Sequence, residues 1–581
     1  MAEPQQSQEV SEEETHCPTA DSVDLEDDHF ETVEEIPVNE VQEDKALPPP
    51  HLTDRIFFID LANKQLQTIS PEALSPEHLE ELHLEKNQIV TIPESIKCLK
   101  KIKVLYLDQN HIQDICEELG ELKSLLNLDL SNNPLSCSSL PVISKLQSLR
   151  QLRLYKINLH EIPVQICENL IHLELLGLSD NNLECLPKEI VNMKKLKEIY
   201  LQKNKFESFP EELCHIASLE IIDLEQNLIS FISDKVGFLT NLVKLFLAFN
   251  DLSFIPPTLQ HCQKLAVLDL SHNLLFKLPS DLKNLTEMKI FRLSTNNLKK
   301  FPRQICCWTA LSHVYLRDLG LHKVPRSFRR LTRVKVLDLS ENCFDKIPKT
   351  ICTMKNLEVL TLDGNQIEKV PVEVKKLTNL KCISLSDNQF SAFPMEIFLL
   401  ESLEILYLGQ ENGIKFTGLP EEICKLQNLK ELHVDNNCLE YLPVTIGSLT
   451  NLKILDCNNN LLKKLPDSVC KLQGLQTLLV QRNHLTQLPK DLDSLQELKL
   501  LLVDENPMTD PPTEVCCQGI SAIWQYLREK RHKKAKLLKI QKIISTLFGN
   551  LEEDFRQSED MNFHQKNLHD HPVFQKCKKL F

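Results

Sequence analysis

The sequence is poor in several features that would assign it to a common class of protein. Its 581 residues include only 12 Gly and 7 Tyr. No run of about 18 apolar residues occurs, so we expect no membrane-spanning helix. The opening segment MAEPQQSQEVSEEET lacks the basic and apolar regions of a signal peptide. These absences predict a cytoplasmic protein, in which the 20 Cys are reduced thiols.

The motifs of common enzyme classes are also absent. The sequence contains no G-x-x-x-x-G-K-S/T, G-x-G-x-x-G, H-E-x-x-H or G-x-S-x-G motif. It contains no C-x-x-C pair, and the adjacent pairs Cys306-Cys307 and Cys516-Cys517 have no His at metal-ligand spacing. We therefore predict a protein that is not an enzyme and has no catalytic, cofactor-binding or metal-binding residues.

The negative charge is concentrated at the N-terminus. The net charge is −16, and residues 1–45 contain sixteen Asp/Glu and one Lys. This acidic composition, with few aromatic residues and an LPPP sequence at its end, predicts a disordered segment over residues 1–50. The remainder is close to neutral, which predicts neither a nucleic-acid partner nor a long basic face.

The sequence is rich in one repeated pattern, L-x-x-L-x-L-x-x-N-x-L. It is clear in LLNLDLSNNPL (125–135), LAVLDLSHNLL (265–275) and VKVLDLSENCF (334–344). Its Asn position recurs twenty times, with steps of 23 residues except for three of 24 and one of 26. Chance does not hold a register over this length, so the pattern predicts a repeat protein. The predicted column is 63, 87, 110, 133, 157, 181, 204, 227, 250, 273, 296, 319, 342, 365, 388, 411, 437, 460, 483 and 506.

These repeats resemble the leucine-rich repeat family over about residues 51–530. Most continue as L-P-x-x-I-x-x-L, as in CLPKEIVNMKKL, which resembles the intracellular class that includes Ras-pathway scaffolds. The resemblance implies an α/β solenoid: a right-handed horseshoe of about twenty 23-residue repeats, with parallel strands on the concave wall and turns on the convex wall. The column Asn is expected to bond backbone groups of adjacent turns. We place the solenoid at residues 51–512.

Seven cysteines share one phase of the repeat, four residues after its Pro. This phase predicts core positions on the convex side, where Cys is a small hydrophobic residue. The closest of the seven are two repeats apart, about 10 Å, which is too far for a disulfide. They are Cys167, Cys214, Cys306, Cys352, Cys424, Cys470 and Cys516.

Residues between the core leucines of each strand are expected to face the concave solvent side. Read along the repeats, the middle position is rich in Tyr, Asp and Arg, and Tyr and Arg are favoured interface anchors. Such a strip suits a folded protein partner, although Tyr and Phe also favour strands for structural reasons. The predicted partner-binding residues are Tyr106, Arg153, Tyr155, Tyr200, Phe246, Arg292, Tyr315, Arg317 and Tyr407.

Three repeats break the Asn column, with Ile157, Leu319 and Glu411 in its place. The third is also the 26-residue repeat, whose three extra residues must form a bulge. A bulge of this kind is either a functional loop or a tolerated insertion.

After the last repeat, residues 513–531 are predicted to form a capping helix. The cap covers the final hydrophobic layer of the solenoid. Residues of its apolar face are Ile520, Ile523, Trp524 and Leu527.

Residues 532–550 are predicted to form a basic amphipathic helix, followed by a polar tail over residues 551–581. Eight Lys/Arg lie between Arg528 and Lys542, and Lys-Ile-Gln at 539–541 resembles the start of an IQ motif, without its later Arg-Gly. Such a helix is typical of a calmodulin target, a membrane-surface patch or a solvated extension of the cap. The residues predicted for contact with calmodulin or a related EF-hand protein are Leu537, Lys539, Ile540, Gln541, Ile544 and Leu547.

Together these patterns predict a non-enzymatic scaffold that binds a folded protein on its concave face, with a calmodulin-type contact at the C-terminal helix. Two alternatives remain at this point: a Ras-pathway or phosphatase scaffold, and a regulatory subunit that holds a catalytic partner in the concavity.

Overall fold

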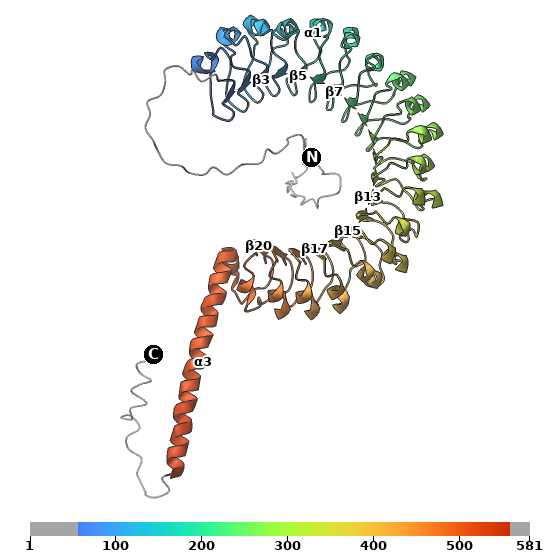
Figure 1. Ribbon diagram of the computed structural model, residues 1–581. Helices are drawn as coiled ribbons and strands as arrows, with labels where there is room; N and C mark the ends of the chain where they lie inside the picture. Colours follow the sequence, from blue (N-terminus) through green and yellow to red (C-terminus); the bar gives the residue numbers. More distant parts are fainter. Residues whose placement is uncertain (1–55, 558–581) are drawn as a thin grey trace, which may run out of the picture. The chain divides into compact units, whose positions relative to one another are not determined.

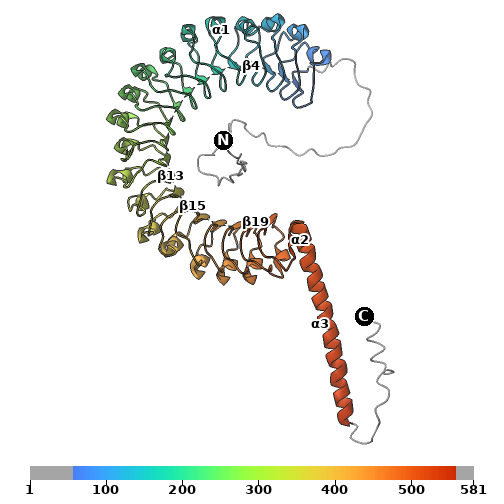
Figure 2. The same ribbon diagram turned by 180° about the vertical axis from the view of Figure 1, so that it is seen from behind.

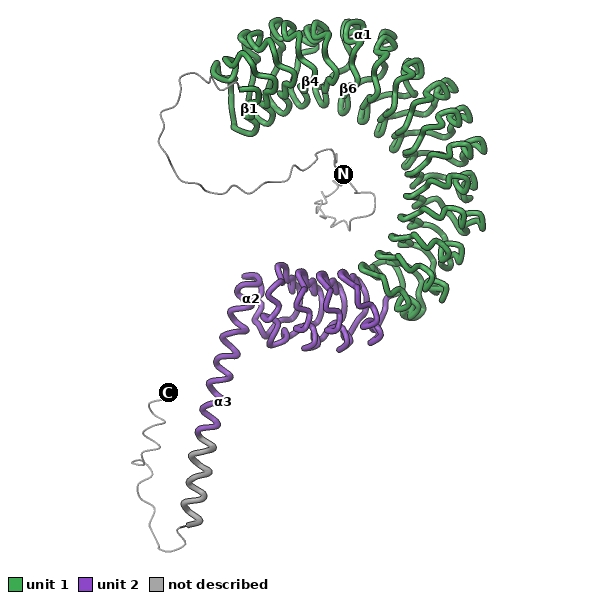
Figure 3. Tube along the Cα trace, in the orientation of Figure 1, with its two compact units in different colours: residues 1–414 green, residues 415–581 purple. Residues whose placement is uncertain are grey.

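The computed structural model describes residues 56–557, and the side chains of residues 56–543. The predicted acidic segment and most of the predicted polar tail therefore lie outside the described residues. The chain divides into two compact units, residues 1–414 and 415–581 (Figure 3). The division falls in the 26-residue repeat that contains Glu411. The predicted bulge thus coincides with the one place where the array separates into units.

Short parallel strands form the inner wall of the first unit, and turns form its outer wall (Figures 1 and 2). Each strand pairs with the next in sequence order, which confirms the predicted parallel sheet. The strands are β1 (Phe58–Asp60), β2 (Glu81–His83), β3 (Val104–Tyr106), β4 (Asn127–Asp129), β5 (Gln151–Arg153), β6 (Leu175–Gly177), β7 (Glu198–Tyr200), β8 (Ile221–Asp223), β9 (Lys244–Phe246), β10 (Val267–Asp269), β11 (Ile290–Arg292), β12 (His313–Tyr315), β13 (Val336–Asp338), β14 (Val359–Thr361), β15 (Cys382–Ser384) and β16 (Ile405–Tyr407).

The outer wall consists of single helical turns, most of them 3₁₀ helices. Many begin directly after the Pro of the repeat, because a fixed proline φ suits the residue that starts a helix. They are η1 (Pro71–Leu74), η2 (Glu94–Cys98), η3 (Glu117–Glu121), η4 (Leu140–Lys145), α1 (Val164–Asn169), η5 (Lys188–Asn192), η6 (Glu211–His215), η7 (Asp234–Phe238), η8 (Pro257–His261), η9 (Ser280–Asn284), η10 (Arg303–Cys307), η11 (Arg326–Arg330), η12 (Ile351–Thr353), η13 (Val372–Lys376) and η14 (Met395–Leu399).

The core lies between the two walls and repeats from turn to turn. The central residue of each strand points inward; Leu105 and Leu128, for example, are fully buried. The residues on either side of it point to the concave face, because side chains alternate along a strand. The 23-residue repeat sets the register, so Tyr106 lies opposite Asp129.

The Asn column satisfies the backbone between successive turns, as predicted. Asn273 is 5% exposed, and its Nδ2 donates hydrogen bonds to the carbonyl oxygens of Leu247 at 2.9 Å and Leu270 at 3.2 Å. Its Oδ1 accepts a hydrogen bond from the N–H of Leu252 at 3.0 Å. Each such Asn therefore joins two repeats through buried groups that would otherwise lack partners.

The predicted column was wrong by one residue in the first repeat. Asn63 has a φ of 55°, and its N–H bonds the carbonyl of Glu85 at 3.0 Å. Lys86 does the same one repeat later, with a φ of 57° and a bond to Asp108. Asn63 is thus the equivalent of Lys86, and Lys64 holds the column position. The first step is 23 residues, since β1 residue Asp60 pairs with His83.

At the three positions where the column lacks Asn, the backbone hydrogen bonds are satisfied in two ways. Ile157 and Leu319 are buried, and the Asn of the following repeat accepts their N–H groups, at 3.1 Å for Asn181 and 3.2 Å for Asn342.

At the third break, the residue before Glu411 replaces the column Asn in bonding backbone groups of the adjacent turn. Gln410 is completely buried, accepts the N–H of Asn388 at 3.0 Å and donates to the carbonyl of Leu385 at 3.4 Å. Gly413 leaves room for it, since a Cβ there would lie 2.1 Å from the Gln410 Oε1.

The second unit holds four further repeats and the C-terminal helix. Its strands are β17 (Glu431–His433), β18 (Ile454–Asp456), β19 (Thr477–Leu479) and β20 (Leu500–Leu502), and its 3₁₀ turns are η15 (Glu421–Lys425), η16 (Val444–Ser448), η17 (Asp467–Lys471) and η18 (Leu492–Ser494). The short helix α2 (Thr513–Cys516) and the long helix α3 (Ile520–Gln557) follow.

The start of α3 covers the end of the second unit. Ile523 is 0% exposed and Leu527 is 3% exposed, while Ile520 and Trp524 are half-buried. Arg531 pairs with Asp491 of the last repeat at 3.3 Å, which helps to fix the helix on the array. The helix does not end at residue 531, so the predicted cap and basic helix are one continuous element.

The in-phase cysteines occupy the predicted positions on the outer side of the core. Cys167, Cys214, Cys306, Cys352 and Cys516 are buried, whereas Cys424 and Cys470 are half-buried. All 18 cysteines among the described residues are free thiols. Burial raises the pKa of Cys167 to about 12, which keeps that thiol protonated.

Candidate partner-binding face

Most of the predicted concave residues share one strand position, and this position forms a continuous row along the sheet of the first unit. The last residue of each strand lies beside its equivalent in the next strand, as shown by the pairs Arg153 with Gly177 and Gly177 with Tyr200. The predicted flanking residues Tyr155 and Arg317 lie two positions further on, just beyond strands β5 and β12. The row is therefore a surface built from many strands, at positions fixed by the repeat.

The row is hollowed between β5 and β11, where a recess of about 800 Å³ opens on the concave face. Five of the nine predicted anchors line this recess, whereas Tyr106, Tyr315, Arg317 and Tyr407 lie outside it. The five are Arg153, Tyr155, Tyr200, Phe246 and Arg292.

The Tyr155 ring lies across the sheet because the next strand has no side chain beneath it. A Cβ on Gly177 would fall 2.4 Å from Cε1 of Tyr155, so a larger residue there would displace the ring. Burial raises the pKa of Tyr155 to about 12. Tyr200, on the strand after Gly177, donates a hydrogen bond from its hydroxyl to Glu198 at 2.8 Å. Gly177 thus widens the aromatic wall of the recess.

The floor of the recess is acidic. Burial raises the pKa of Asp223 to about 6, and burial together with the charges of Asp223 and Asp269 raises the pKa of Glu225 to about 8. Burial also raises the pKa of Asp269, although Arg292 lies 3.5 Å from its carboxylate. Glu225 was missed by the sequence analysis because its importance comes from carboxylates on neighbouring repeats.

Tyr315 is less accessible than predicted. Only 6% of this residue is exposed, and the Arg292 guanidinium lies 5.3 Å from the centre of its ring. The cation covers the aromatic face, an arrangement that is favourable in itself. The structure therefore presents Arg292, rather than Tyr315, to a partner at this point.

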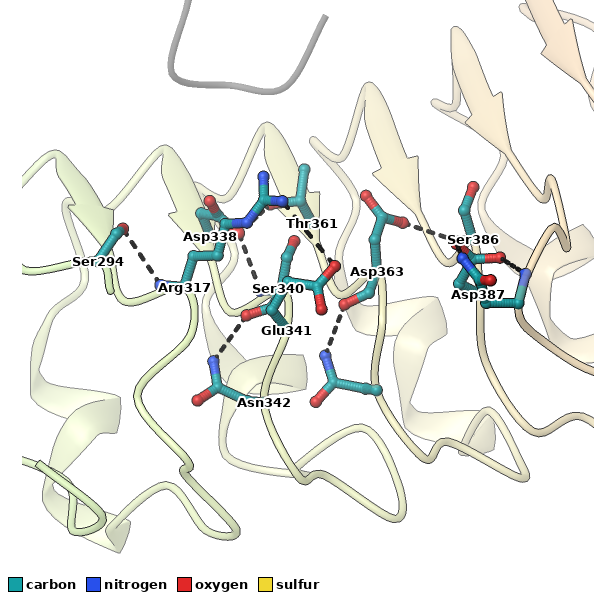
Figure 4. A network of polar contacts seen from close by, with 12 residues as sticks. Ser294, Arg317, Asp338, Ser340, Glu341, Asn342, Thr361, Asp363, Ser386 and Asp387 are labelled. Atoms are coloured by element: carbon teal, nitrogen blue, oxygen red, sulfur yellow. Dashed lines mark hydrogen bonds and ion pairs between the residues drawn. The ribbon is translucent and has the colours of Figure 1, made fainter. Parts of the chain in front are cut away.

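A second polar cluster lies beyond the recess and holds Arg317 (Figure 4). The Arg317 guanidinium lies 3.9 Å from the Glu341 carboxylate. Nearby, Asp338 accepts a hydrogen bond from the Thr361 hydroxyl at 2.7 Å, and Asp363 accepts one from the Ser386 N–H at 2.7 Å. Burial raises the pKa of Asp363 to about 6. Glu341 contacts the preceding repeat, whereas Asp338 and Asp363 contact the following one, so this cluster ties adjacent repeats together.

Between residues 532 and 543, all side chains of the C-terminal helix except that of Ile540 are exposed to solvent. Leu537 is 59% exposed, and Lys539 and Gln541 are also exposed, while Ile540 is half-buried. Two apolar residues absent from the prediction, Leu538 and Ile543, are 56% and 52% exposed. The side chains of the predicted contacts Ile544 and Leu547 lie outside the described residues. No helix between residues 56 and 557 has the length and hydropathy needed to cross a membrane.

Sequence comparisons identify the repeats. The profile described as "Leucine-rich repeat region" matches residues 128–254, 326–436, 372–459 and 420–515, more than half of the chain. Two further profiles, both described as leucine-rich repeat, match residues 59–112 and 264–285.

Among curated proteins, the chain is similar to leucine-rich repeat and IQ domain-containing protein 4. The human protein is 54% identical over 166 residues, which cover 29% of this chain and 30% of the relative. The mouse protein is 55% identical over 166 residues, which cover 29% of this chain and 28% of the relative. The alignments thus span less than a third of these relatives.

Solved structures give the same fold. A leucine-rich repeat protein of Leptospira interrogans is 30% identical, with a TM-score of 0.54, over 72% of this chain and 94% of that one. A plant peptide hormone receptor, solved in complex with RGF2, is 26% identical, with a TM-score of 0.52, over 76% of this chain and 80% of the receptor.

Proposed function

Because this chain belongs to the leucine-rich repeat family, we propose that it is a non-enzymatic scaffold that binds a protein partner in the recess of its first unit. The recess between β5 and β11 carries this proposal, since it gathers five of the predicted anchors above an acidic floor. Buried aromatic and arginine side chains dominate the free energy of many protein interfaces. The plant receptor in the comparison was solved with RGF2, which supports a partner of polypeptide nature here.

The chemistry of the recess defines the segment that fits it. Asp223 attracts a Lys or Arg side chain, while the rings of Tyr155 and Phe246 offer apolar surface to the residues beside it. The proposed partner therefore inserts a cationic residue flanked by apolar ones. A Ras-pathway or phosphatase scaffold and a regulatory subunit both remain compatible with such an interface, and they differ in the partner that is captured.

Capture of partners from cytosol by the full chain tests this proposal. We expect the Tyr155→Ala variant to lose the partner by about tenfold, because the variant removes a ring from the recess. Tyr441→Ala is the matched control, since Tyr441 is an exposed tyrosine of the second unit, 55% exposed and remote in sequence from the recess. Both variants must keep the melting temperature of the parent chain. Equal recovery of every captured protein by the two variants would contradict the proposal.

A second binding function is favoured by the exposed part of α3. We infer that this part binds calmodulin or a related EF-hand protein in a calcium-dependent manner, as apolar residues such as Leu537 stand exposed among the lysines. In the full chain, Ile540→Glu should abolish calmodulin binding, whereas Gln541→Ala should leave it unchanged. Affinity should fall as salt rises. Binding that is tight in chelator and lost in Gln541→Ala would identify a working IQ motif instead.

A further inference from the structure

The near-neutral average of residues 46–581 conceals a strongly basic region. Residues 277–335 contain fourteen Lys/Arg and three Asp/Glu. Arg292 and Arg317 lie at the concave face, and the other twelve side chains are exposed. The twelve are Lys277, Lys283, Lys289, Lys299, Lys300, Arg303, Lys323, Arg326, Arg329, Arg330, Arg333 and Lys335. We call these twelve residues the basic block.

Among the described residues, only one cation of the basic block makes an ion pair of the kind that several other exposed lysines of this protein make. Elsewhere, lysines reach an acid one repeat away, as in Lys103–Glu80 at 2.7 Å and Lys197–Glu174 at 3.1 Å. Within the block, Lys335 pairs with Glu358 at 3.0 Å. The remaining eleven make no ion pair with any residue that the structure describes. Such a concentration of unpaired charge favours an acidic ligand.

A recess of about 1360 Å³ lies within the basic block. Five of the block's cations line it: Lys283, Lys299, Lys300, Arg303 and Lys323. Its lining includes a single acid, Asp345, whose carboxylate pairs with Lys346 at 3.3 Å. Phe301, Val324 and Pro325 add apolar surface. The recess therefore matches an acidic peptide that carries apolar side chains better than it matches phosphate groups alone.

The same chain contains a segment with this chemistry. Residues 21–44, DSVDLEDDHFETVEEIPVNEVQED, hold eleven acids with Val, Leu, Phe and Ile residues between them. The segment lies outside the described residues, in the N-terminal part of the chain. Its charge is opposite to that of the block and of similar size.

The segment is long enough to reach the block. Ten strand-to-strand steps separate β1 from β11, about 50 Å along the sheet and more along the outer wall. The 28 residues from Asp28 to Ile56 can span up to about 90 Å. A tether of this kind raises the effective concentration of the segment to about the millimolar range.

We propose that residues 21–44 dock on the basic block, with their apolar side chains in the recess that Lys283, Lys299 and Arg303 line. The contact is intramolecular and electrostatic, and it covers the block until a stronger polyanion displaces the segment. The proposal is independent of the concave face and of α3.

Carbodiimide cross-linking of the full chain, followed by mass spectrometry, tests this contact. The reagent joins a carboxylate to a nearby amine, so residues 21–44 should cross-link to Lys283 and Lys323. Charge reversal by Lys299→Glu/Lys300→Glu should lower these cross-links by about fivefold or more. The matched control, Lys375→Glu/Lys376→Glu, reverses an adjacent pair of exposed lysines outside the block and should leave them unchanged. About 0.5 M salt should also remove them.

Mixing isotope-labelled with unlabelled protein distinguishes the occupants. Cross-links within one isotopic species support the intramolecular contact, whereas mixed cross-links would assign the block to a second copy and overturn it. Equal cross-linking in the two charge-reversal variants would also overturn it. So would the absence of these cross-links together with binding of a single-stranded oligonucleotide at physiological salt, which would assign the block to nucleic acid.

Discussion

The Asn column and the concave row run through the same repeats but carry different information. In the column, Asn273 and Asn460 make the same set of bonds, although they belong to different units: each donates to a carbonyl of the preceding repeat at 2.9 Å and accepts a backbone N–H at 3.0 Å. In the concave row, neighbouring positions such as Arg153, Gly177 and Tyr200 differ in size and charge. Positions that recur specify the stacking, and positions that vary would specify the partner in the proposed function.

The strongest test of this comparison is removal of a column residue. Asn273→Ala should lower the free energy of unfolding by about 1–3 kcal/mol, because several buried backbone groups lose their partner at once. Asn158→Gly is the control, because Gly adopts the φ of 60° at this position without strain: the exposed Asn158 lies one place past the column and accepts a single side-chain bond from Asn182 at 2.6 Å. Chemical denaturation measures both. Equal losses would mean that the column does not hold the repeats together.

A smaller effect is expected where the column is irregular. Gln410→Ala should cost about 1–2 kcal/mol, since it leaves the N–H of Asn388 without its partner, while the bonds that Gln410 donates are long at 3.4 and 3.5 Å. Glu411→Ala should change stability by less than about 0.5 kcal/mol, because that side chain is exposed. Chemical denaturation of the two variants shows which residue replaces the column Asn in this repeat. A larger loss for Glu411→Ala would restore the simple 23-residue register.

The fold could be predicted from the sequence because each repeat confirms the next, whereas the site depends on contacts that do not repeat. Tyr155 was predicted as an anchor, but its orientation depends on Gly177 in the following strand. Tyr315 was predicted to be exposed, yet Arg292 of the preceding strand covers it. Gln410 was not recognised, since only its buried side chain identifies it as the substitute for Asn. Counting charges over short stretches of the sequence would have found the basic block, which the net charge of the whole chain does not reveal.

The acidic floor of the concave recess should respond to pH in the direction opposite to a paired carboxylate. The raised pKa of Glu225, about 8 against 4.5, means that the folded protein binds more protons than the unfolded chain between these values. Its contribution to stability is therefore lost as pH rises from about 4.5 to about 8. Glu225→Gln should stabilise the protein by about 1 kcal/mol at pH 8 and have little effect at pH 4.5.

The control for this prediction is Glu207→Gln, an exposed glutamate on the neighbouring repeat. It should alter thermal stability at neither pH. A stabilisation by Glu225→Gln that is the same at both pH values would show that a neighbouring group already neutralises the negative charge of Glu225.

The smallest effect on stability is expected from modification of the exposed cysteines outside the repeat phase. Cys98, Cys137, Cys185, Cys307 and Cys517 are exposed, so an alkylating reagent should modify them rapidly in the native protein without unfolding it. The in-phase thiols should react in an order that follows their burial: the half-buried Cys424 and Cys470 first, and the buried Cys167 and Cys352 only slowly. Burial raises the pKa of Cys352 to about 11 and that of Cys167 to about 12, so few thiolates are present at neutral pH. Time-resolved mass spectrometry of alkylated peptides measures these rates. Rapid modification of Cys167 in the folded protein would show that the phase of the repeat does not define the core. Recurring positions would then not differ from varying positions in the way that we infer.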